Sequence, residues 1–235
     1  MPVSPEQLKR QGNAGLNVNI DLWVWDLDAR QDVDLSVLCN EEQQRAGRFV
    51  QPLHQNRYAV GRATLRHILA RYTGISASGL AFDYGPNGKP SLSGEVFFNL
   101  SHSENTAALA VTKGCDLGLD IQHYRPVETD LAERFFSLSE RKELAAIGAE
   151  RFADGFFRCW TRKEAVLKAH GEGLSVELDS FDVTLTPDAP PQLLRYAPDP
   201  SCVENLTLHH LDFAPELVGA IAVFSHARPV TITRR

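Results

Sequence analysis

The stretch FFRCWTRKEAVLKA, residues 156–169, is the starting point for predicting the fold. Its aromatic and aliphatic residues gather on one side at helical spacing, and Gly171 follows where such a helix would end. Two apolar segments downstream, 206–211 and 218–224, have the composition of strands. The second part of the chain is therefore predicted to be a long helix followed by a closing pair of strands.

The first part of the chain follows the same order. Residues 57–72 have a helical period and precede Gly74, and the segments 96–100 and 106–111 are predicted as strands joined by the polar link SHSEN. TAALAV at 106–111 resembles VGAIAV at 218–223. These two similar segments close the two halves, so we expect a duplicated unit.

This internal similarity predicts an α+β fold with two similar α+β halves. The junction is expected near Lys113–Gly114, so that residues 1–113 form the N-terminal half and residues 114–235 the C-terminal half. Each half is expected to run through a helix, a glycine terminator, a turn-rich stretch and a closing pair of strands.

Other local patterns complete the prediction. Residues 18–27 alternate partly and are predicted as a strand, and residues 1–17 are expected to be loose. Ser139 is expected to cap a helix over 140–147. The segment 187–200 carries five prolines and is predicted as a loop.

The charge balance and the lengths of the apolar runs exclude several classes of protein. The 24 Lys+Arg against 30 Asp+Glu leave a net charge of −6, which argues against general nucleic-acid binding. The longest apolar run, residues 217–224, is far short of the ~20 residues that a membrane helix needs. We therefore expect neither nucleic acid nor membrane as a partner.

The cysteines and the N-terminus indicate a cytoplasmic protein. Cys39, Cys115, Cys159 and Cys202 lie too far apart for a CxxC metal pair. The N-terminus has no apolar segment after its first charges, so a secretory signal is not expected. Four reduced thiols are the simplest interpretation.

A strand with one carboxylate is the first candidate site. In GLDIQ, residues 118–122, strand alternation puts Leu119 and Ile121 on one face and Asp120 with Gln122 on the other. A carboxylate fixed on a strand is a good ligand for a hard cation such as Mg²⁺. The alternative is an acidic residue that simply faces solvent.

The helix 160–168 supplies a second carboxylate. Glu164 is four residues after Trp160, beside the expected core face, and four residues before Lys168. A partly buried glutamate next to a lysine can act as a metal ligand or as a base. The alternative is an ordinary surface ion pair between Glu164 and Lys168.

Anion-binding groups occur at three further places. In FNLSHS, residues 98–103, hydroxyls and an imidazole can hold a phosphate, or they can simply form a polar turn. Arg57, Arg62 and Arg66 recur at helical spacing as an anion site or a solvated basic face, and Lys89 lies in a turn. Neither glycine-rich phosphate-loop motif is present.

Taken in order, these segments resemble the Sfp-type 4′-phosphopantetheinyl transferase family. The resemblance covers roughly residues 57–185, and its specificity comes from order and spacing. The matching pieces are Gly88–Pro90, Phe98–Ser103, Gly118–Ile121, Arg134–Ser137, Trp160–Ala165, Lys168, Gly171–Leu174 and Leu178–Phe181.

The resemblance implies a fold, an activity and a set of site residues. The fold would be a pseudo-dimer of two α+β halves with the active site at their interface. The activity would move the phosphopantetheine arm of coenzyme A to a serine of an apo acyl or peptidyl carrier protein, releasing adenosine 3′,5′-bisphosphate. Asp120 and Glu164 match the family's metal ligands, and Lys168 matches the group near the pyrophosphate. The residues that match its coenzyme A contacts are Arg57, Arg62, Lys89, Ser101, His102 and Lys163.

One position departs from the family pattern. Many members have glutamate two residues after the strand aspartate, where this chain has Gln122. The amide oxygen can still be a metal ligand, but it brings no charge. With Asp120 and Glu164 as ligands to Mg²⁺ or Mn²⁺, Glu164 is the expected base and Lys168 the group that stabilises the leaving bisphosphate.

The partner and two competing functions follow from the same residues. An acidic carrier would need a local basic surface, for which Arg141, Lys142, Arg151, Arg158 and Arg162 are the candidates. A monomer is expected, because the two halves supply each other's partner surface. The alternatives are an Mg²⁺-dependent nucleotide hydrolase and a carrier-binding module without catalysis, the latter favoured by Gln122 alone.

Overall fold

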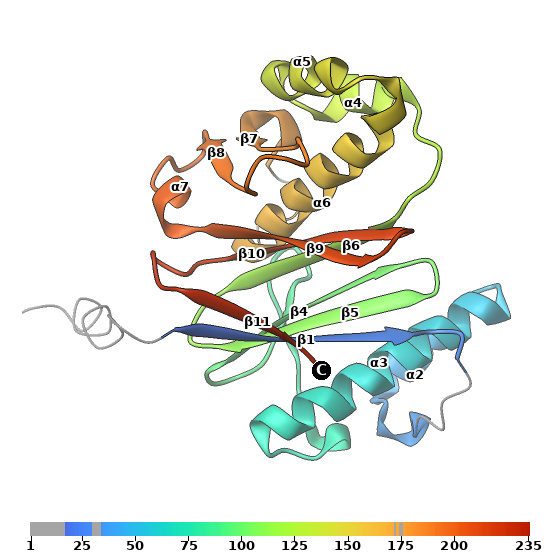
Figure 1. Ribbon diagram of the computed structural model, residues 1–235. Helices are drawn as coiled ribbons and strands as arrows, with labels where there is room; N and C mark the ends of the chain where they lie inside the picture. The colour runs from blue at the N-terminus through green and yellow to red at the C-terminus, as the bar shows by residue number, and fades with distance from the viewer. Residues whose placement is uncertain (1–16, 30–33, 172, 174–175) are drawn as a thin grey trace, which may run out of the picture.

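The computed structural model describes residues 17–29, 34–171, 173 and 176–235. The expectation for residues 1–16 and the matches at Glu172 and Leu174 lie outside the described residues. The described chain forms four layers in the order helix, sheet, sheet, helix (Figure 1). The α+β fold expected from the sequence is confirmed.

The N-terminal half is a four-stranded sheet with one long helix against it. The sheet has the strand order β11-β1-β5-β4, with β11 parallel to β1 and the other pairs antiparallel. Helix α3 packs on its outer face through Val60, Leu65 and Leu69. The bounds are Val18–Asp26 (β1), Pro52–Thr73 (α3), Val96–Ser103 (β4), Thr106–Lys113 (β5) and Val230–Arg234 (β11).

The C-terminal half repeats this arrangement with a three-stranded antiparallel sheet. Its strand order is β6-β10-β9, and helix α6 covers the outer face (Figure 1). Gly171 ends α6 in the left-handed conformation, as Gly74 ends α3. The bounds are Leu117–His123 (β6), Phe152–His170 (α6), Thr207–Ala214 (β9) and Leu217–Val223 (β10).

The two similar segments noted in the sequence are interior strands of the two sheets. In β10, Val218, Ala220 and Ala222 face α6, while Ile221 and Val223 face the other sheet. In β5, Leu109 and its alternate neighbours face α3, and Ala108 and Ala110 face the sheet of the C-terminal half. Both strands are buried on both faces, which is why neither shows polar alternation.

Shorter elements surround these layers. In the N-terminal half they are η1 (Leu35–Val37), α2 (Asn40–Gly47), η2 (Ala77–Gly79), β2 (Asp83–Tyr84) and β3 (Pro90–Ser91). In the C-terminal half they are α4 (Thr129–Phe135), α5 (Leu138–Ile147), η3 (Ala149–Arg151), η5 (Leu178–Ser180), β7 (Phe181–Val183), β8 (Leu193–Tyr196) and α7 (Cys202–Asn205). Within the described part of the chain, no helix combines the length and apolar character needed to cross a bilayer.

Three local predictions were wrong. The link SHSEN is mostly strand, because β4 continues to Ser103 and only Glu104 and Asn105 turn the chain. Ser137, and not Ser139, caps α5: its hydroxyl accepts from the Glu140 N–H while the Glu140 carboxylate accepts from the Ser137 N–H. Strand β8 lies inside the proline-rich segment predicted as a loop.

The chain does not keep the two halves fully separate. Strand β11 belongs to the C-terminal half in sequence, yet it pairs in parallel with β1 of the N-terminal sheet. Its short polar alternation, VTITR, gave no signal for that partner. The last strand therefore extends the first sheet and ties both ends of the described fold to it.

Candidate active site

Asp120 lies on the face of β6 that packs against α6. Leu119 and Ile121 point into the core between the sheets, as strand alternation predicts. The Asp120 side chain is 3% exposed, and its Oδ1 accepts from Lys168 Nζ at 2.6 Å and from Ser101 Oγ at 2.9 Å. A buried carboxylate is thus held by groups from both halves of the molecule.

Glu164 approaches the same place from α6, one turn before Lys168. Burial raises the pKa of Glu164; the positive charge of Lys168 lowers this pKa and the negative charge of Asp120 raises it. Among the described residues Glu164 forms no ion pair within 4.0 Å. The structure therefore brings Asp120, Glu164 and Lys168 together. The Asp120 carboxylate is paired with Lys168, whereas the Glu164 carboxylate has no ion-pair partner among the described residues.

Gly118 makes this closeness of β6 and α6 possible. A Cβ atom at Gly118 would lie 2.1 Å from the Ala165 carbonyl oxygen and 2.3 Å from the Ala169 nitrogen. The strand and the helix are therefore in backbone contact at this point. Gly118 contacts α6 at Ala165 and Ala169, Asp120 contacts Lys168, and Gln122 lines a pocket with Trp160 of the same helix.

A row of polar side chains on β4 joins the two halves. Asn99 Oδ1, Ser101 Oγ and Ser103 Oγ accept from the backbone N–H groups of Leu119, Ile121 and His123 at 2.8, 3.3 and 2.9 Å. These alternate residues of β4 are all buried and satisfy alternate N–H groups of the neighbouring edge strand β6. Ser101 therefore joins the two sheets through the Ile121 N–H, a structural role in addition to its expected contact with coenzyme A.

His102 and Lys89 lie near this junction with different surroundings. His102 keeps an exposed side chain on β4, but packing around its ring lowers its pKa, Lys168 lowers it further, and Asp120 opposes the shift. Lys89 Nζ donates to the carbonyl oxygens of Leu117 and Ala169 at 3.2 and 3.1 Å, at the C-terminal end of α6. Both remain predicted ligand contacts.

The arginines of α3 are already paired with carboxylates. Arg57 donates to Asp28 at 2.7 Å, and Arg62 and Arg66 donate to opposite oxygens of the buried Glu42, each at 2.7 Å. A phosphate at Arg57 or Arg62 must therefore compete with these acidic partners. Their role toward a 3′-phosphate stays a prediction.

Lys163 is buried in the core, away from any position where it could contact coenzyme A. Its side chain is 1% exposed, and its amine is 2.8 Å from the Glu140 carboxylate and 2.6 Å from the carbonyl oxygens of both Leu178 and Phe181. Neighbouring positions on α6 point in different directions, so Glu164 faces the site while Lys163 is directed into the core. We correct its role from substrate contact to fold stabilisation.

We expect Lys163→Met to destabilise the protein without weakening coenzyme A binding by the folded enzyme. The substitution leaves Glu140 buried without its cation, which costs about 3–5 kcal/mol. Chemical denaturation measures the loss, and adding Glu140→Gln should recover part of it. Unchanged stability combined with a raised KM for coenzyme A would return Lys163 to the substrate site.

The donor set around Asp120 suits a hard divalent cation. The described residues contain no group of three or more His, Cys, Asp or Glu side chains arranged for a metal ion. Asp120 and Glu164 supply carboxylates, and Gln122 Nε2 lies 3.3 Å from Asp120 Oδ2, so turning this amide would present its oxygen. Two carboxylates and an amide oxygen are ligands of the kind that Mg²⁺ prefers.

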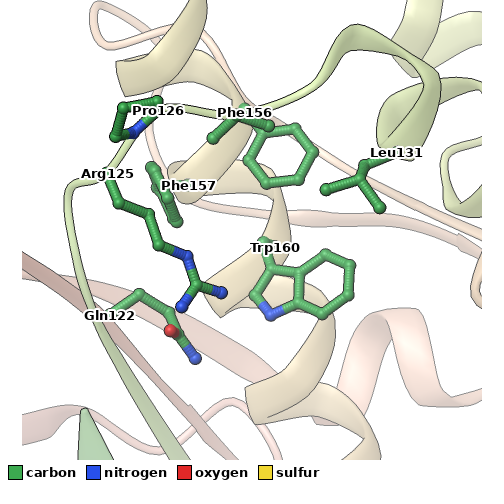
Figure 2. A pocket seen from close by; sticks show the side chains of 8 residues that line it. Gln122, Arg125, Pro126, Leu131, Phe156, Phe157 and Trp160 are labelled. Atoms are coloured by element: carbon green, nitrogen blue, oxygen red, sulfur yellow. The ribbon is translucent and has the colours of Figure 1, made fainter. Parts of the chain in front are cut away.

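An apolar pocket of about 60 Å³ opens beside this site (Figure 2). Phe156, Phe157 and Trp160 of α6 form one wall, and Leu131 and the segment 125–127 form the other. Gln122 lines the pocket and also contacts Asp120, so the pocket adjoins the carboxylates. The sequence analysis missed the loop residues, because nothing in the local pattern of 125–127 indicates a binding surface.

Part of the predicted basic surface is not available to a partner. Arg162 is 1% exposed and donates to the Thr184 carbonyl oxygen, and burial lowers its pKa to about 10. Arg158 is paired with Asp154 at 2.8 Å. Lys142 and Arg151 are exposed, and the Arg151 guanidinium lies 3.8 Å from the Asp188 carboxylate.

Comparison with known proteins gives the same family along the chain. Residues 116–222 match the 4′-phosphopantetheinyl transferase superfamily, and residues 26–114 match the N-terminal family "4′-phosphopantetheinyl transferase, N-terminal". The 4′-phosphopantetheinyl transferase HetI of Nostoc sp. is 36% identical over 86% of this chain and 92% of its own length. A 4′-phosphopantetheinyl transferase of Bacillus subtilis is 32% identical over 67% and 71%, and Sfp of Bacillus subtilis is 28% identical over 78% and 87%.

The chain belongs to the 4′-phosphopantetheinyl transferase superfamily and is a phosphopantetheinyl transferase. Within that superfamily its likeness to HetI and Sfp makes it a member of the Sfp type, as the sequence motifs predicted.

Proposed function

We propose that the enzyme transfers the phosphopantetheine arm of coenzyme A to a serine of an apo carrier protein at the junction of β4, β6 and α6. The observation that carries this location is the convergence of Asp120, Glu164 and Lys168. These residues come from two separate segments within residues 116–222, the range that matches the superfamily. They provide two carboxylates and one ammonium in a partly buried setting, and phosphoryl-type transfer depends on such positioning and charge stabilisation.

Asp120 and Glu164, with the amide oxygen of Gln122, are the residues that would hold Mg²⁺, or Mn²⁺ in its place. When bound there, the ion neutralises charge on the pyrophosphate and orients the bond that breaks. Gln122 brings no formal charge, so this donor set has two negative charges. The contact of Ser101 with Asp120 keeps the strand carboxylate oriented.

Glu164 is proposed to accept the proton of the carrier serine. In the metal-free site burial raises the pKa of Glu164, and among the described residues its carboxylate forms no ion pair, so it is open to a proton donor. The serine oxygen forms a bond to the β-phosphorus, and the bond from that phosphorus to the bridging oxygen breaks. The electron pair leaves with adenosine 3′,5′-bisphosphate, whose new charge the Lys168 ammonium stabilises.

The apolar pocket of Figure 2 is proposed to take the dimethyl end of the pantetheine arm, which is the part next to the pyrophosphate. The arm carries methyl groups and amides, which match an aromatic wall with Gln122 and Arg125 at its polar side. Because Gln122 also touches Asp120, a substrate with its phosphates at the carboxylates can reach this pocket.

Filling this pocket should weaken coenzyme A binding selectively. We expect Leu131→Trp to raise the KM for coenzyme A about tenfold, because the indole would occupy space meant for the arm. Inhibition by adenosine 3′,5′-bisphosphate, which lacks the arm, should not change. Leu194→Trp on β8, another exposed leucine, is the control. Equal weakening of both ligands by Leu131→Trp would place the arm elsewhere.

The activity is tested by incubating the enzyme with coenzyme A, Mg²⁺ and apo carrier proteins of fatty acid, polyketide and nonribosomal peptide systems. A carrier mass gain of one phosphopantetheine arm supports the proposal. Nucleotide breakdown without that gain would support the hydrolase alternative, and carrier binding with neither would support a module that has lost catalysis.

The enzyme is further proposed to act as a monomer in the cytoplasm. The inner faces of the two sheets already bury each other in a common apolar core, which supports a self-contained chain. The described structure pairs no two cysteines in a disulfide, which is in keeping with a reducing compartment. Light scattering should give a mass near 26.1 kDa.

A further inference from the structure

We propose that Lys168 is an internal counter-cation: its ammonium holds the carboxylate site when divalent ion and coenzyme A are absent, and its release couples the binding of the two. This inference rests on the proposed function of the site. It assigns Lys168 a role before substrate arrives, in addition to its proposed contact with the leaving group.

The contacts of Lys168 place its charge directly on the carboxylate expected to bind metal. Its Nζ is 2.6 Å from Asp120 Oδ1 and 3.4 Å from Ser101 Oγ, which also donates to that oxygen. The Asp120 side chain is only 3% exposed, so leaving it without a cation would be costly. A divalent ion bound to this oxygen must therefore displace the ammonium or share the oxygen with it.

Lys168 can leave this position, whereas two other lysines near α6 are fixed. The Lys163 amine is buried among Glu140 and two carbonyl oxygens, and Lys89 is held by two carbonyl oxygens and Asp116. Lys168 is 30% exposed, and its described acceptors are side chains of the site itself. Its flexible stem lets the charge move toward solvent or toward an incoming anion.

This arrangement predicts positive coupling between metal and coenzyme A. Without coenzyme A, a metal ion competes with a tethered ammonium for Asp120. With coenzyme A bound, its pyrophosphate offers the ammonium another anionic partner, and the competition is relieved. Coupling of this kind is reciprocal, so metal must tighten coenzyme A binding by the same factor.

The test is a titration of the coenzyme A-free enzyme with Mn²⁺. Electron paramagnetic resonance measures the concentration of unbound Mn²⁺ at each step. We expect Lys168→Met to bind Mn²⁺ about five- to tenfold more tightly than wild type, although it removes a residue of the site. Coenzyme A should tighten Mn²⁺ binding to wild type by a similar factor and to Lys168→Met much less. Lys113→Met, which removes an exposed lysine at the end of β5, controls for the change in net charge.

Two further variants separate the possible failures. Asp120→Asn should abolish tight Mn²⁺ binding; if it binds Mn²⁺ as wild type does, the metal site of the proposed function is wrong. If Asp120→Asn loses binding but Lys168→Met binds Mn²⁺ no more tightly than wild type, the counter-cation role is overturned while the site stands. If Lys168→Met does not fold, Lys168→Gln repeats the test. The effect of coenzyme A on Mn²⁺ affinity can also be measured in the wild-type enzyme without any variant.

Discussion

Glu164→Gln is expected to lower the rate of transfer by about 100- to 10,000-fold. The amide has nearly the same shape as the carboxylate, but it cannot take the serine proton and brings no charge to the metal. The loss should appear in kcat, since the residue is proposed to act on the nucleophile. Single-turnover transfer to a carrier protein measures it, with Glu133→Gln on the exposed face of α4 as a control.

The same substitution should not destabilise the fold. Burial raises the pKa of Glu164, so folding favours its uncharged form. Its contribution to stability is then present below the unfolded pKa and lost as pH rises through the folded pKa. In metal-free buffer at about pH 8, we expect the Tm of Glu164→Gln to equal or exceed that of wild type, with the difference vanishing near about pH 4.

Two results would contradict these roles. Near-normal transfer by Glu164→Gln would remove Glu164 as the base. A large drop in Tm would indicate that the carboxylate stabilises the protein, and the lost rate would then reflect unfolding. Activity that rises with pH in wild type and loses that rise in the variant would support proton transfer to this group.

Gly118→Ala is expected to cause the largest loss of stability among single-methyl substitutions on β6. The added carbon would overlap the α6 backbone at Ala165 and Ala169, and a backbone cannot move aside as a flexible side chain can. We expect a loss of about 3 kcal/mol or more, or failure to fold. Chemical denaturation, or the soluble yield if folding fails, measures the effect.

Gly47→Ala is the matched control for this prediction. Gly47 lies at the end of α2, and a Cβ there would meet no atom within 4 Å. Alanine at that position should be neutral or slightly stabilising, because it restricts the unfolded chain. If Gly118→Ala folds with wild-type stability, then β6 and α6 are farther apart than described here, and Asp120 and Glu164 would lose their shared position.

Periodic patterns were sufficient to predict the layers and the main acidic residues. Strand alternation put Asp120 on the face opposite Leu119, and helical spacing put Glu164 beside the core, where burial shifts its pKa. Both inferences depend on periods of two and 3.6 residues, which the sequence displays directly. The similar segments 106–111 and 218–223 are interior strands of the two sheets, and the division of the chain at Lys113–Gly114 stays a prediction.

Contacts between distant segments could not be predicted in this way. Ser101 and Asp120 come from different sheets, and no local pattern shows that their side chains meet. Lys163 lies beside Glu164 in the sequence, but its partner Glu140 comes from another helix, so its burial was missed. Strand β11 is short and partly polar, and its pairing with β1 spans nearly the whole chain.

That last pairing has a consequence for how the polypeptide is made. The ribosome makes β1 more than 200 residues before β11, so one edge of β1 has no partner until residues 230–234 emerge. The sheet of the half made first is therefore complete only after β11 has been made. Early folding is therefore expected to begin in the hairpin of β4 and β5, whose pairing closes within a few residues.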